Sequence, residues 1–174
     1  LVVALGMALT PMLGALGNAL DDMYENKDVL KLQPSEGEVD DLRGHVIVAG
    51  FGRVGQMICQ LLGEQFIPFT ALDVRSDRVA KGRDMEMPVY FGDSGSAAVL
   101  HSVGASKAAC AVVVLDTPGA NYRCVWAIKK HYPNVKVYVR ARDVAHGLNL
   151  ERAGASAVVP ETLEPSLQLA AAVL

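Results

Sequence analysis

The chain has 174 residues, of which 51% are hydrophobic, and a net charge of −3, which fits one ordinary domain plus an additional segment. No basic stripe with interleaved aromatic residues occurs, so nucleic acid is not expected as a partner. The three cysteines and four histidines lack CxxC, HExxH and other metal-ligand spacings, so we predict no metal site. The cysteines have apolar neighbours and are interpreted as small core residues in a reducing compartment.

The first 20 residues contain no Asp, Glu, Lys or Arg. A helix of that length spans about 30 Å, the thickness of a bilayer's hydrocarbon core. Because an initiating Met and a basic leader are absent, we expect not a signal peptide but a fragment that begins with the last transmembrane helix of a larger protein. A buried helix at a domain interface is the alternative, since Pro11 and several small residues lower its hydropathy.

Residues 21–43 are polar and acidic, with eight Asp and Glu residues against three Lys and Arg residues, a balance of −5. The rest of the chain, residues 44–174, therefore carries +2. We interpret 21–43 as an acidic linker and 44–174 as a folded domain. The mildly positive charge of this domain suits an anionic small ligand.

From residue 44 onward, short apolar runs alternate with helical patterns, which is typical of parallel strands joined by crossover helices. The continuous apolar run at 111–115 indicates a strand covered on both faces. The predicted fold class is α/β: a Rossmann-like, doubly wound parallel six-stranded sheet in the order 3-2-1-4-5-6, preceded by an apolar helix and an acidic linker. The predicted strands are 45–49, 69–73, 89–91, 109–115, 135–140 and 157–159, and the predicted helices are 53–64, 77–85, 96–103, 121–131, 144–153 and 163–174.

A glycine pattern, Gly50-Phe51-Gly52-Arg53-Val54-Gly55, joins the first predicted strand of this domain to its first helix. In dinucleotide-binding folds the first glycine permits a sharp turn, the second lets the backbone approach a phosphate, and the third lets helix and strand pack. The helix start offers free N–H groups and the positive end of its dipole to an anion. Asp73 ends the next strand, where a carboxylate can accept hydrogen bonds from ribose hydroxyls. A turn kept only for packing is the alternative.

Small and polar residues also follow the other predicted strands, whose carboxyl ends meet at one crevice. Each group has an alternative role in local structure. Asp93 and Ser94 are possible caps of the next helix, and Asp116 is a possible start of a turn at Thr117-Pro118-Gly119. Arg142 and Asp143 form, in the alternative interpretation, a solvated ion pair of little energetic value.

A catalytic constellation is not recognisable in this sequence. No Ser/His/Asp or Cys/His arrangement is visible, and no Lys follows a predicted strand as a proton-transferring group would. We therefore predict that the chain is not an enzyme but a sensor, in which ligand binding biases an attached transporter or channel. The nicotinamide-binding half of an oxidoreductase, with its catalytic domain elsewhere, is the alternative.

Four runs of residues carry a resemblance to a known family: the glycine pattern with Asp73, Val89-Tyr90-Phe91-Gly92-Asp93-Ser94, Leu100-His101-Ser102-Val103-Gly104-Ala105, and Arg140-Ala141-Arg142-Asp143. Together they resemble the regulatory nucleotide-binding domain of potassium systems, called RCK-N, KTN or TrkA-N. Within that family the chain is similar to the glutathione-regulated potassium-efflux antiporters (Kef) and their plastid relatives (KEA). The run Asn121-Tyr122-Arg123-Cys124-Val125-Trp126 resembles the plastid branch most.

The resemblance implies a domain that gates a potassium/proton antiporter in a membrane, with the antiporter's own membrane domain as its partner and potassium and protons as the transported ions. It also implies a homodimer through the RCK-N domain and a bound adenine nucleotide: AMP, ADP, ATP or NAD(H). The implied membrane is the chloroplast envelope or the thylakoid, with a bacterial plasma membrane as the alternative. An RCK subunit of a potassium channel or uptake system is a further alternative.

The resemblance also implies roles for individual residues. The phosphates lie against the glycine pattern with Arg53, Asp73 holds the ribose, and Asp73 disfavours a 2′-phosphate, although Arg75 leaves NADP(H) open. In the Kef branch a second, regulatory site takes glutathione, but the neighbours of Asn121 differ here from the bacterial pattern. The implied nucleotide-binding residues are Gly50, Phe51, Gly52, Arg53, Val54, Gly55, Asp73, Val74, Arg75, Gly92, Asp93, Ser94, Asp116 and Arg140, and the implied regulatory-ligand residues are Asn121, Arg140 and Arg142.

Overall fold

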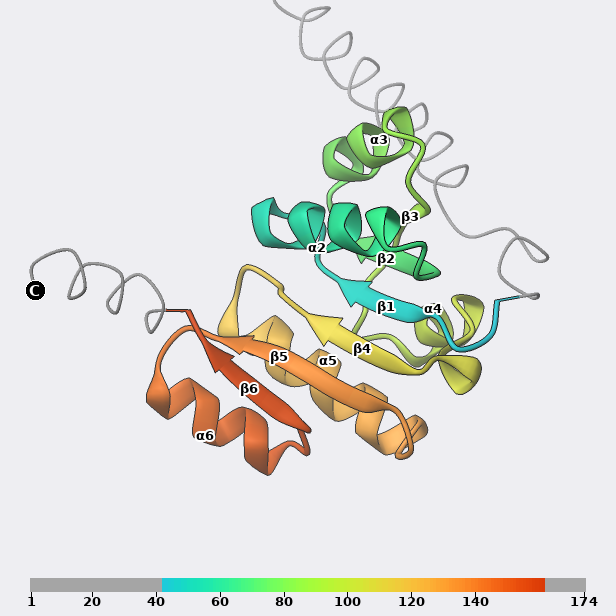
Figure 1. Ribbon diagram of the computed structural model, residues 1–174. Helices are drawn as coiled ribbons and strands as arrows, with labels where there is room; N and C mark the ends of the chain where they lie inside the picture. The colour runs from blue at the N-terminus through green and yellow to red at the C-terminus, as the bar shows by residue number, and fades with distance from the viewer. Residues whose placement is uncertain (1–41, 162–174) are drawn as a thin grey trace, which may run out of the picture. The chain divides into compact units, whose positions relative to one another are not determined.

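The computed structural model describes residues 42–161, so the predicted membrane helix, most of the linker and the predicted helix at 163–174 lie outside the described residues. Strands and helices alternate along the described part (Figure 1). The strands are β1 (Val46–Ala49), β2 (Phe69–Asp73), β3 (Val89–Phe91), β4 (Cys110–Val113), β5 (Lys136–Ala141) and β6 (Ala157–Pro160). The helices are α2 (Arg53–Glu64), α3 (Ser76–Asp84), α4 (Ala97–Ser102), a 3₁₀ turn η1 (Ala105–Lys107), α5 (Pro118–His131) and α6 (Val144–Arg152).

The six strands form one sheet in the order β3-β2-β1-β4-β5-β6, and every neighbouring pair is parallel. The predicted fold class and strand order are thus confirmed. β1 lies in the centre, with Val46 in register with Phe69 of β2 and Cys110 of β4. β2 and β3 lie on one side of β1, whereas β4, β5 and β6 lie on the other. The strand order therefore reverses at β1, which is the point where doubly wound sheets open a ligand crevice.

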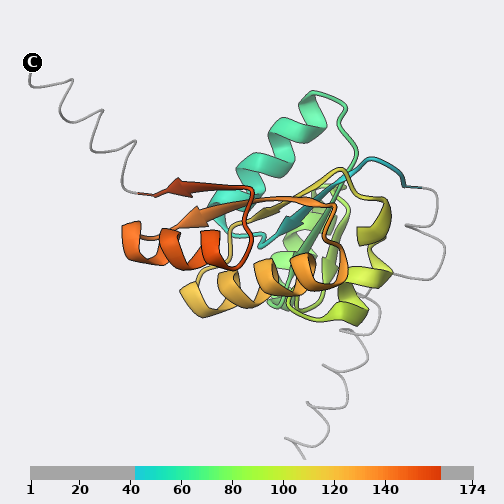
Figure 2. The ribbon, with the colours of Figure 1, turned by 90° about the horizontal axis from the view of Figure 1, so that it is seen from below.

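Helices cover the two faces of the sheet unequally. Figure 2 shows α2 on one face, and α5 and α6 on the opposite face beneath β4, β5 and β6. Along β5 the residues alternate in exposure, with Val137, Val139 and Ala141 buried. Within residues 42–161, the face of β5 and β6 that is opposite α5 and α6 carries no helix. None of the helices in this range is long and apolar enough to cross a membrane.

The start of α5 differs from the predicted turn at Thr117-Pro118-Gly119. Thr117 is instead the N-cap of a helix that begins at Pro118, and its side chain accepts a hydrogen bond from the Ala120 N–H at 3.4 Å. Proline suits the first helical position because its missing N–H has no intrahelical partner there and its φ is already helical. The predicted start of this helix at Asn121 was therefore three residues late, and β4 ends before the apolar run does.

His45 precedes β1 and is fully buried, and its Nε2 donates to the carbonyl of Val103 at 2.9 Å. Burial lowers the pKa of His45 below its ordinary value of 6.5; the Val103 bond opposes this shift and Lys107 adds to it. As the pH falls below 6.5, the unfolded chain therefore takes up a proton before the folded chain does. We expect the free energy of unfolding to be highest above that pH and to fall as the pH is lowered through and below 6.5.

Urea denaturation across this range measures the effect. The matched variant is His45→Gln, which keeps a side-chain N–H donor but cannot titrate, and it should show a smaller loss of stability on acidification than the parent chain. Equal losses in the two proteins would show that His45 does not contribute to the pH dependence.

Candidate functional site

The glycine turn, Gly50–Gly55, has two glycines that packing alone requires. Gly50 has a φ of +105°, and a Cβ there would lie 2.9 Å from the carbonyl oxygen of Val114. A Cβ on Gly55 would overlap the carbonyl oxygen of Gly50. The first and third glycines are therefore needed for the close approach of β1, β4 and α2, with or without a ligand.

Gly52, the second glycine, is different because packing does not demand it. A Cβ there would meet only side-chain atoms at ordinary contact distance: Arg78 Nη1 and Asp116 Oδ1, each at 3.5 Å. Gly52 is also the N-cap of α2, where no side chain caps the helix and no acidic residue lies in the first turn. The N–H groups at the start of α2 are thus not capped by a side chain, and such a helix start is a site that suits an anion.

Asp73, at the end of β2, is only 3% exposed and binds the glycine turn directly. Its Oδ2 accepts a hydrogen bond from the Phe51 N–H at 2.7 Å, and its Oδ1 accepts one from the Arg75 N–H at 2.9 Å. A carboxylate offers about four acceptor positions, so these two bonds leave capacity for ribose hydroxyls. The carboxylate therefore lies where the sequence analysis placed it, but it is covered in the described conformation.

Arg78, in the first turn of α3, was not singled out by the sequence analysis. Its guanidinium reaches Asp73 Oδ2 at 3.3 Å and Asp116 Oδ2 at 2.8 Å. Partial burial opposes the charge of Arg78, but the hydrogen bonds to Asp116 and Asp73 outweigh that effect and raise its pKa. The arginine therefore links the ends of β2 and β4 across the glycine turn.

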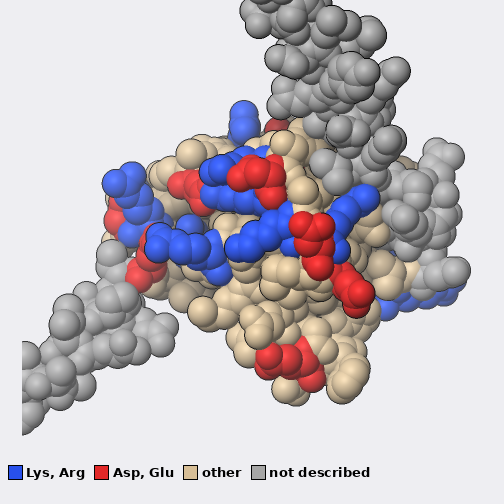
Figure 3. Space-filling model, turned by 90° about the horizontal axis from the view of Figure 1, so that it is seen from above, with Lys and Arg blue, Asp and Glu red and all other residues tan. Residues whose placement is uncertain are grey.

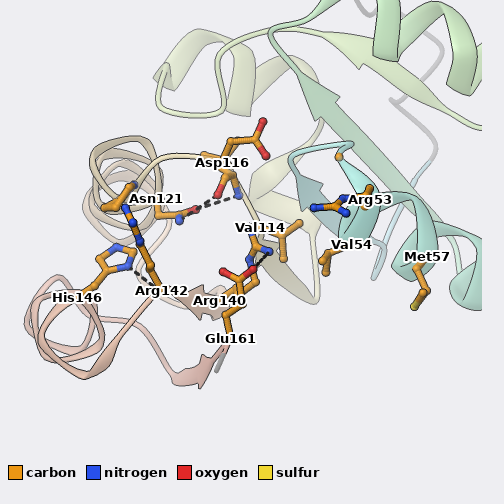
Figure 4. Close-up of a pocket in the computed structure, with 13 residues that line it drawn as sticks. Arg53, Val54, Met57, Val114, Asp116, Asn121, Arg140, Arg142, His146 and Glu161 are labelled. Carbon is orange, nitrogen blue, oxygen red and sulfur yellow. Dashed lines mark hydrogen bonds and ion pairs between the residues drawn. The ribbon is translucent and has the colours of Figure 1, made fainter. Parts of the chain in front are cut away.

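A pocket of about 430 Å³ opens beside the glycine turn, on the side of β4, β5 and β6 (Figure 4). Its lining includes seven predicted residues, which the structure thus brings together: Gly52, Arg53, Val54, Asp116, Asn121, Arg140 and Arg142. The remaining lining residues are Met57, Val114, Leu115, Pro118, His146 and Glu161. The predicted residues outside this lining are Gly50, Phe51, Gly55, Asp73, Val74, Arg75, Gly92, Asp93 and Ser94.

The predicted residues outside the pocket lie at the ends of β2 and β3 or beneath the glycine turn, and several of them have local hydrogen-bond or ion-pair partners. Arg75 pairs with Asp77 at 2.7 Å, where both side chains are more than half exposed. Asp93 accepts a hydrogen bond from the Gly95 N–H at 2.8 Å, while the helix that follows, α4, has Ser96 as its N-cap. Ser94 is 2% exposed. Any adenosine contact here would therefore lie apart from the pocket described above.

The basic residues of the pocket come from opposite sides. Figure 4 shows Arg53 entering from α2, and Arg140 and Arg142 entering from the end of β5. Arg140 pairs with Glu161 at 3.2 Å, whereas the guanidinium groups of Arg53 and Arg142 have no ion pair within residues 42–161. Two unneutralised guanidinium groups in one pocket favour an anionic ligand.

Asn121 and His146 lie at the same end of the pocket as Arg142. Asn121 is 4% exposed, and its side-chain amide bonds both the N–H and the carbonyl of Leu115, at 3.0 and 3.2 Å. These bonds hold together the connection between β4 and α5.

His146 was missed by the sequence analysis because nothing in its spacing marks it. Its Nδ1 accepts the Arg142 N–H at 3.2 Å, and its Nε2 is buried without a partner among the described residues. With Nδ1 as the acceptor, Nε2 carries the proton and is an unused donor at this end of the pocket.

Two further sequence alternatives are resolved locally. Asp143 is the N-cap of α6, where its Oδ1 accepts the His146 N–H at 2.8 Å, and no ion pair joins it to Arg142 within the described residues.

Cys59 and Cys124 are fully buried, and burial raises the pKa of each thiol to about 12. Those two cysteines thus behave as core residues. No cluster of potential metal ligands occurs within residues 42–161.

Charge on the surface is mixed rather than of one sign. Figure 3 shows Lys and Arg side chains in a band across one face, with Asp and Glu side chains interspersed among them. Such a surface does not resemble the continuous basic stripe of a nucleic-acid-binding domain.

Comparison with known proteins gives one consistent picture. The family model for the TrkA-N domain matches residues 46–161. The chain is 66% identical over 174 residues to the chloroplastic K(+) efflux antiporter 2 of Arabidopsis thaliana, covering all of this chain and 15% of that protein. It is 36% identical over 168 residues to the glutathione-regulated potassium-efflux system protein KefC of Enterobacter sp. (strain 638), covering 97% of this chain and 26% of KefC.

One solved structure is informative beyond the fold. The Kef C-terminal domain of Shewanella denitrificans in its AMP-bound form superposes with a TM-score of 0.64 and 30% sequence identity. The match covers 72% of this chain and 75% of that one. The chain thus spans a small part of these two relatives, but most of a separately solved domain.

Proposed function

This chain belongs to the TrkA-N domain family, and from that premise we propose that it is a regulatory domain that binds an adenine nucleotide and gates a potassium/proton antiporter. The observation that carries the proposal is the uncapped start of α2, where Gly52 and Arg53 face a pocket and Asp73 stands at the neighbouring strand end. This combination supplies a phosphate site and a ribose acceptor in the order that the doubly wound fold requires.

In the proposed complex the phosphates lie on the N–H groups at the start of α2, and Arg53 adds its guanidinium. Asp73 accepts the ribose hydroxyls, and the adenine lies between Val74 with Arg75 and the Gly92-Asp93-Ser94 segment. The AMP in the Kef domain of Shewanella supports this class of ligand. An acidic residue at Asp73 disfavours the 2′-phosphate of NADP(H), which leaves AMP, ADP, ATP and NAD(H).

Calorimetric titration of the 174-residue chain with AMP, ADP, ATP and NADH tests the proposal. At least one of them should bind, and Arg53→Ala should weaken binding by about 1.5–3 kcal/mol if its guanidinium bonds a phosphate. Lys81→Ala is the matched control, since Lys81 is an exposed base on α3 whose side chain, among the described residues, bonds Gln56. A folded chain that gives no heat with any of the four nucleotides would refute the proposed function.

The proposed context is a membrane antiporter that exchanges potassium for protons. Its support is the identity to the chloroplastic antiporter of Arabidopsis and to KefC. In this proposal residues 1–20 are the end of the last transmembrane helix, 21–43 are the acidic linker and 44–174 are the regulatory domain. The chloroplast envelope or thylakoid is the proposed membrane, and the domain faces a reducing compartment. Potassium efflux from vesicles that contain the whole antiporter should respond to nucleotide.

We also propose that the domain forms a homodimer. On the face of β5 and β6 opposite α5 and α6, which carries no helix within residues 42–161, Tyr138 and Val159 are 39% and 61% exposed. Met57 and Leu61 of the neighbouring α2 are 65% and 55% exposed. Arg140 lies on this same face and lines the pocket, so a second copy seated there would adjoin the site. Sedimentation velocity tests the proposal, and a monomer at every accessible concentration would refute it.

A second ligand at Arg140 and Arg142 is a further part of this proposal. The unpaired guanidinium of Arg142 and the unused Nε2–H of His146 support an anionic regulatory ligand at that end of the pocket. Asn121 would line the pocket wall without a hydrogen bond to the ligand, because its amide is already bonded to Leu115.

We do not assign catalysis to the domain. An oxidoreductase would instead oxidise NADH with an electron acceptor, and the absence of such turnover would support the regulatory assignment.

A further inference from the structure

Arg78 occupies the place that a nucleotide would need. It projects from the start of α3, and its guanidinium spans from Asp73 after β2 to Asp116 after β4, at 3.3 and 2.8 Å. Because β1 lies between β2 and β4 in the sheet, this bridge crosses the carboxyl end of β1, where the glycine turn begins.

The bridge also lies directly over Gly52. The position of a Cβ on Gly52 is 3.5 Å from Arg78 Nη1 and 3.5 Å from Asp116 Oδ1, so the ion pair borders the space that the missing Gly52 side chain leaves open. Gly52 is the glycine that packing does not require and the one at which a phosphate approaches the turn. The Arg78–Asp116 pair and a phosphate therefore compete for the same space.

Arg78 also covers the ribose acceptor. Asp73 is 3% exposed, and two of its described hydrogen bonds come from the backbone N–H groups of Phe51 and Arg75. The remaining described partner is Arg78, whose side chain is itself 22% exposed and so lies at the surface. The Arg78 guanidinium thus takes an acceptor position of the Asp73 carboxylate that a ribose hydroxyl would otherwise use.

We propose that Arg78 is a clasp that closes the nucleotide site in the ligand-free chain and that opens when a phosphate replaces Asp116 as its partner. The inference rests on the proposed nucleotide site. A closed site lowers the apparent affinity of every ligand by the fraction of molecules that are open. A phosphate offsets this loss because it accepts two hydrogen bonds from the released guanidinium, whereas an uncharged nucleoside does not. Arg78 thus selects nucleotides over nucleosides.

Two variants and two ligands test the clasp by calorimetry. Arg78→Ala should bind adenosine about fivefold more tightly than the parent chain, and its preference for AMP over adenosine should shrink by at least about fivefold. Asp116→Asn, which removes one anchor but keeps Arg78, should also bind adenosine more tightly. Lys81→Ala, which removes a positive charge from the same helix, should leave both affinities unchanged. Circular dichroism of each variant checks that it is folded.

Two results would overturn the clasp. If Asp116→Asn strengthens the binding of AMP but not of adenosine, the effect is simple charge repulsion, because adenosine carries no charge. If Arg78→Ala weakens adenosine binding, Arg78 contacts the nucleoside and does not exclude it.

A readout without nucleotide separates this inference from the proposed function. The Arg78 side-chain N–H signals in ¹⁵N NMR should be protected from solvent exchange in the ligand-free chain, and the protection should be lost in Asp116→Asn. If no nucleotide binds but the protection follows this pattern, the proposed function fails and the clasp stands as a structural bridge. If nucleotides bind and the Arg78 signals exchange freely in the parent chain, the clasp fails alone.

Discussion

Replacing Gly55 with alanine is expected to lower the free energy of unfolding by about 3 kcal/mol or more, or to prevent folding. The new Cβ would overlap the carbonyl oxygen of Gly50, which is a backbone atom and cannot rotate away as a side chain would. Gly50 is itself held in place, since its N–H donates to the Leu72 carbonyl at 2.8 Å. Relief of the overlap therefore requires α2 to move away from β1, and that movement opens the core.

The matched control is Gly119→Ala in the first turn of α5. A Cβ on Gly119 meets nothing within 4 Å, so this variant should be neutral or slightly more stable, by up to about 1 kcal/mol, because alanine favours the helix. Urea denaturation of both variants provides the comparison. A Gly55→Ala chain with an unchanged unfolding midpoint would show that the turn is not as closely packed as described.

Replacing Asp73 with alanine is expected to weaken nucleotide binding by about 1–3 kcal/mol, which is roughly fivefold to 150-fold, and to destabilise the fold as well. Ribose loses its acceptor, and the buried Phe51 N–H loses its 2.7 Å partner. A buried donor without a partner costs about 1–3 kcal/mol of stability. Arg78 also keeps only one of its two acids.

Asp84→Ala controls for the loss of an acidic residue on the neighbouring helix. Asp84 ends α3 at the surface and has no ion pair among residues 42–161, so its replacement should leave the unfolding midpoint and the nucleotide affinity nearly unchanged. Calorimetry and thermal unfolding of the two variants separate the effects on binding and on stability. If Asp73→Ala binds nucleotide as the parent chain does, the ribose lies elsewhere.

The central part of the fold was predictable because its signals are local. The apolar run before Gly50 and the periodic segment after Gly55 predicted β1 and α2, and α2 was correct at both ends. Parallel connections of this kind are right-handed, and together with the glycine pattern after β1 they favoured the order 3-2-1-4-5-6 that is typical of dinucleotide-binding sheets. The start of α5 was misplaced because a Thr-Pro-Gly sequence is typical both of a turn and of a capped helix start. In the structure Thr117 caps the helix, and its side chain accepts the Ala120 N–H.

The site was only partly predictable, for a physical reason. Glycines and a strand-end acid announce a phosphate turn and a ribose acceptor by spacing alone, and Asp73 does lie against the turn. The partners of Arg78 are 5 and 38 positions away along the chain, and His146 is an ordinary residue in a helical pattern. Its buried, unused Nε2 becomes visible only when β5 and α6 are brought beside the end of β4.

Chain-local chemistry was therefore enough to establish a doubly wound sheet, its glycine turn and the family resemblance, because backbone sterics and hydrophobic periodicity act over a few residues. Only folding decided which arginines are neutralised and which remain free. Arg78 meets two acids from separate strands, whereas Arg53 and Arg142 face the pocket without an acidic partner among residues 42–161. Charge pairing depends on distances through space, and those distances are set by how the strands are ordered in the sheet.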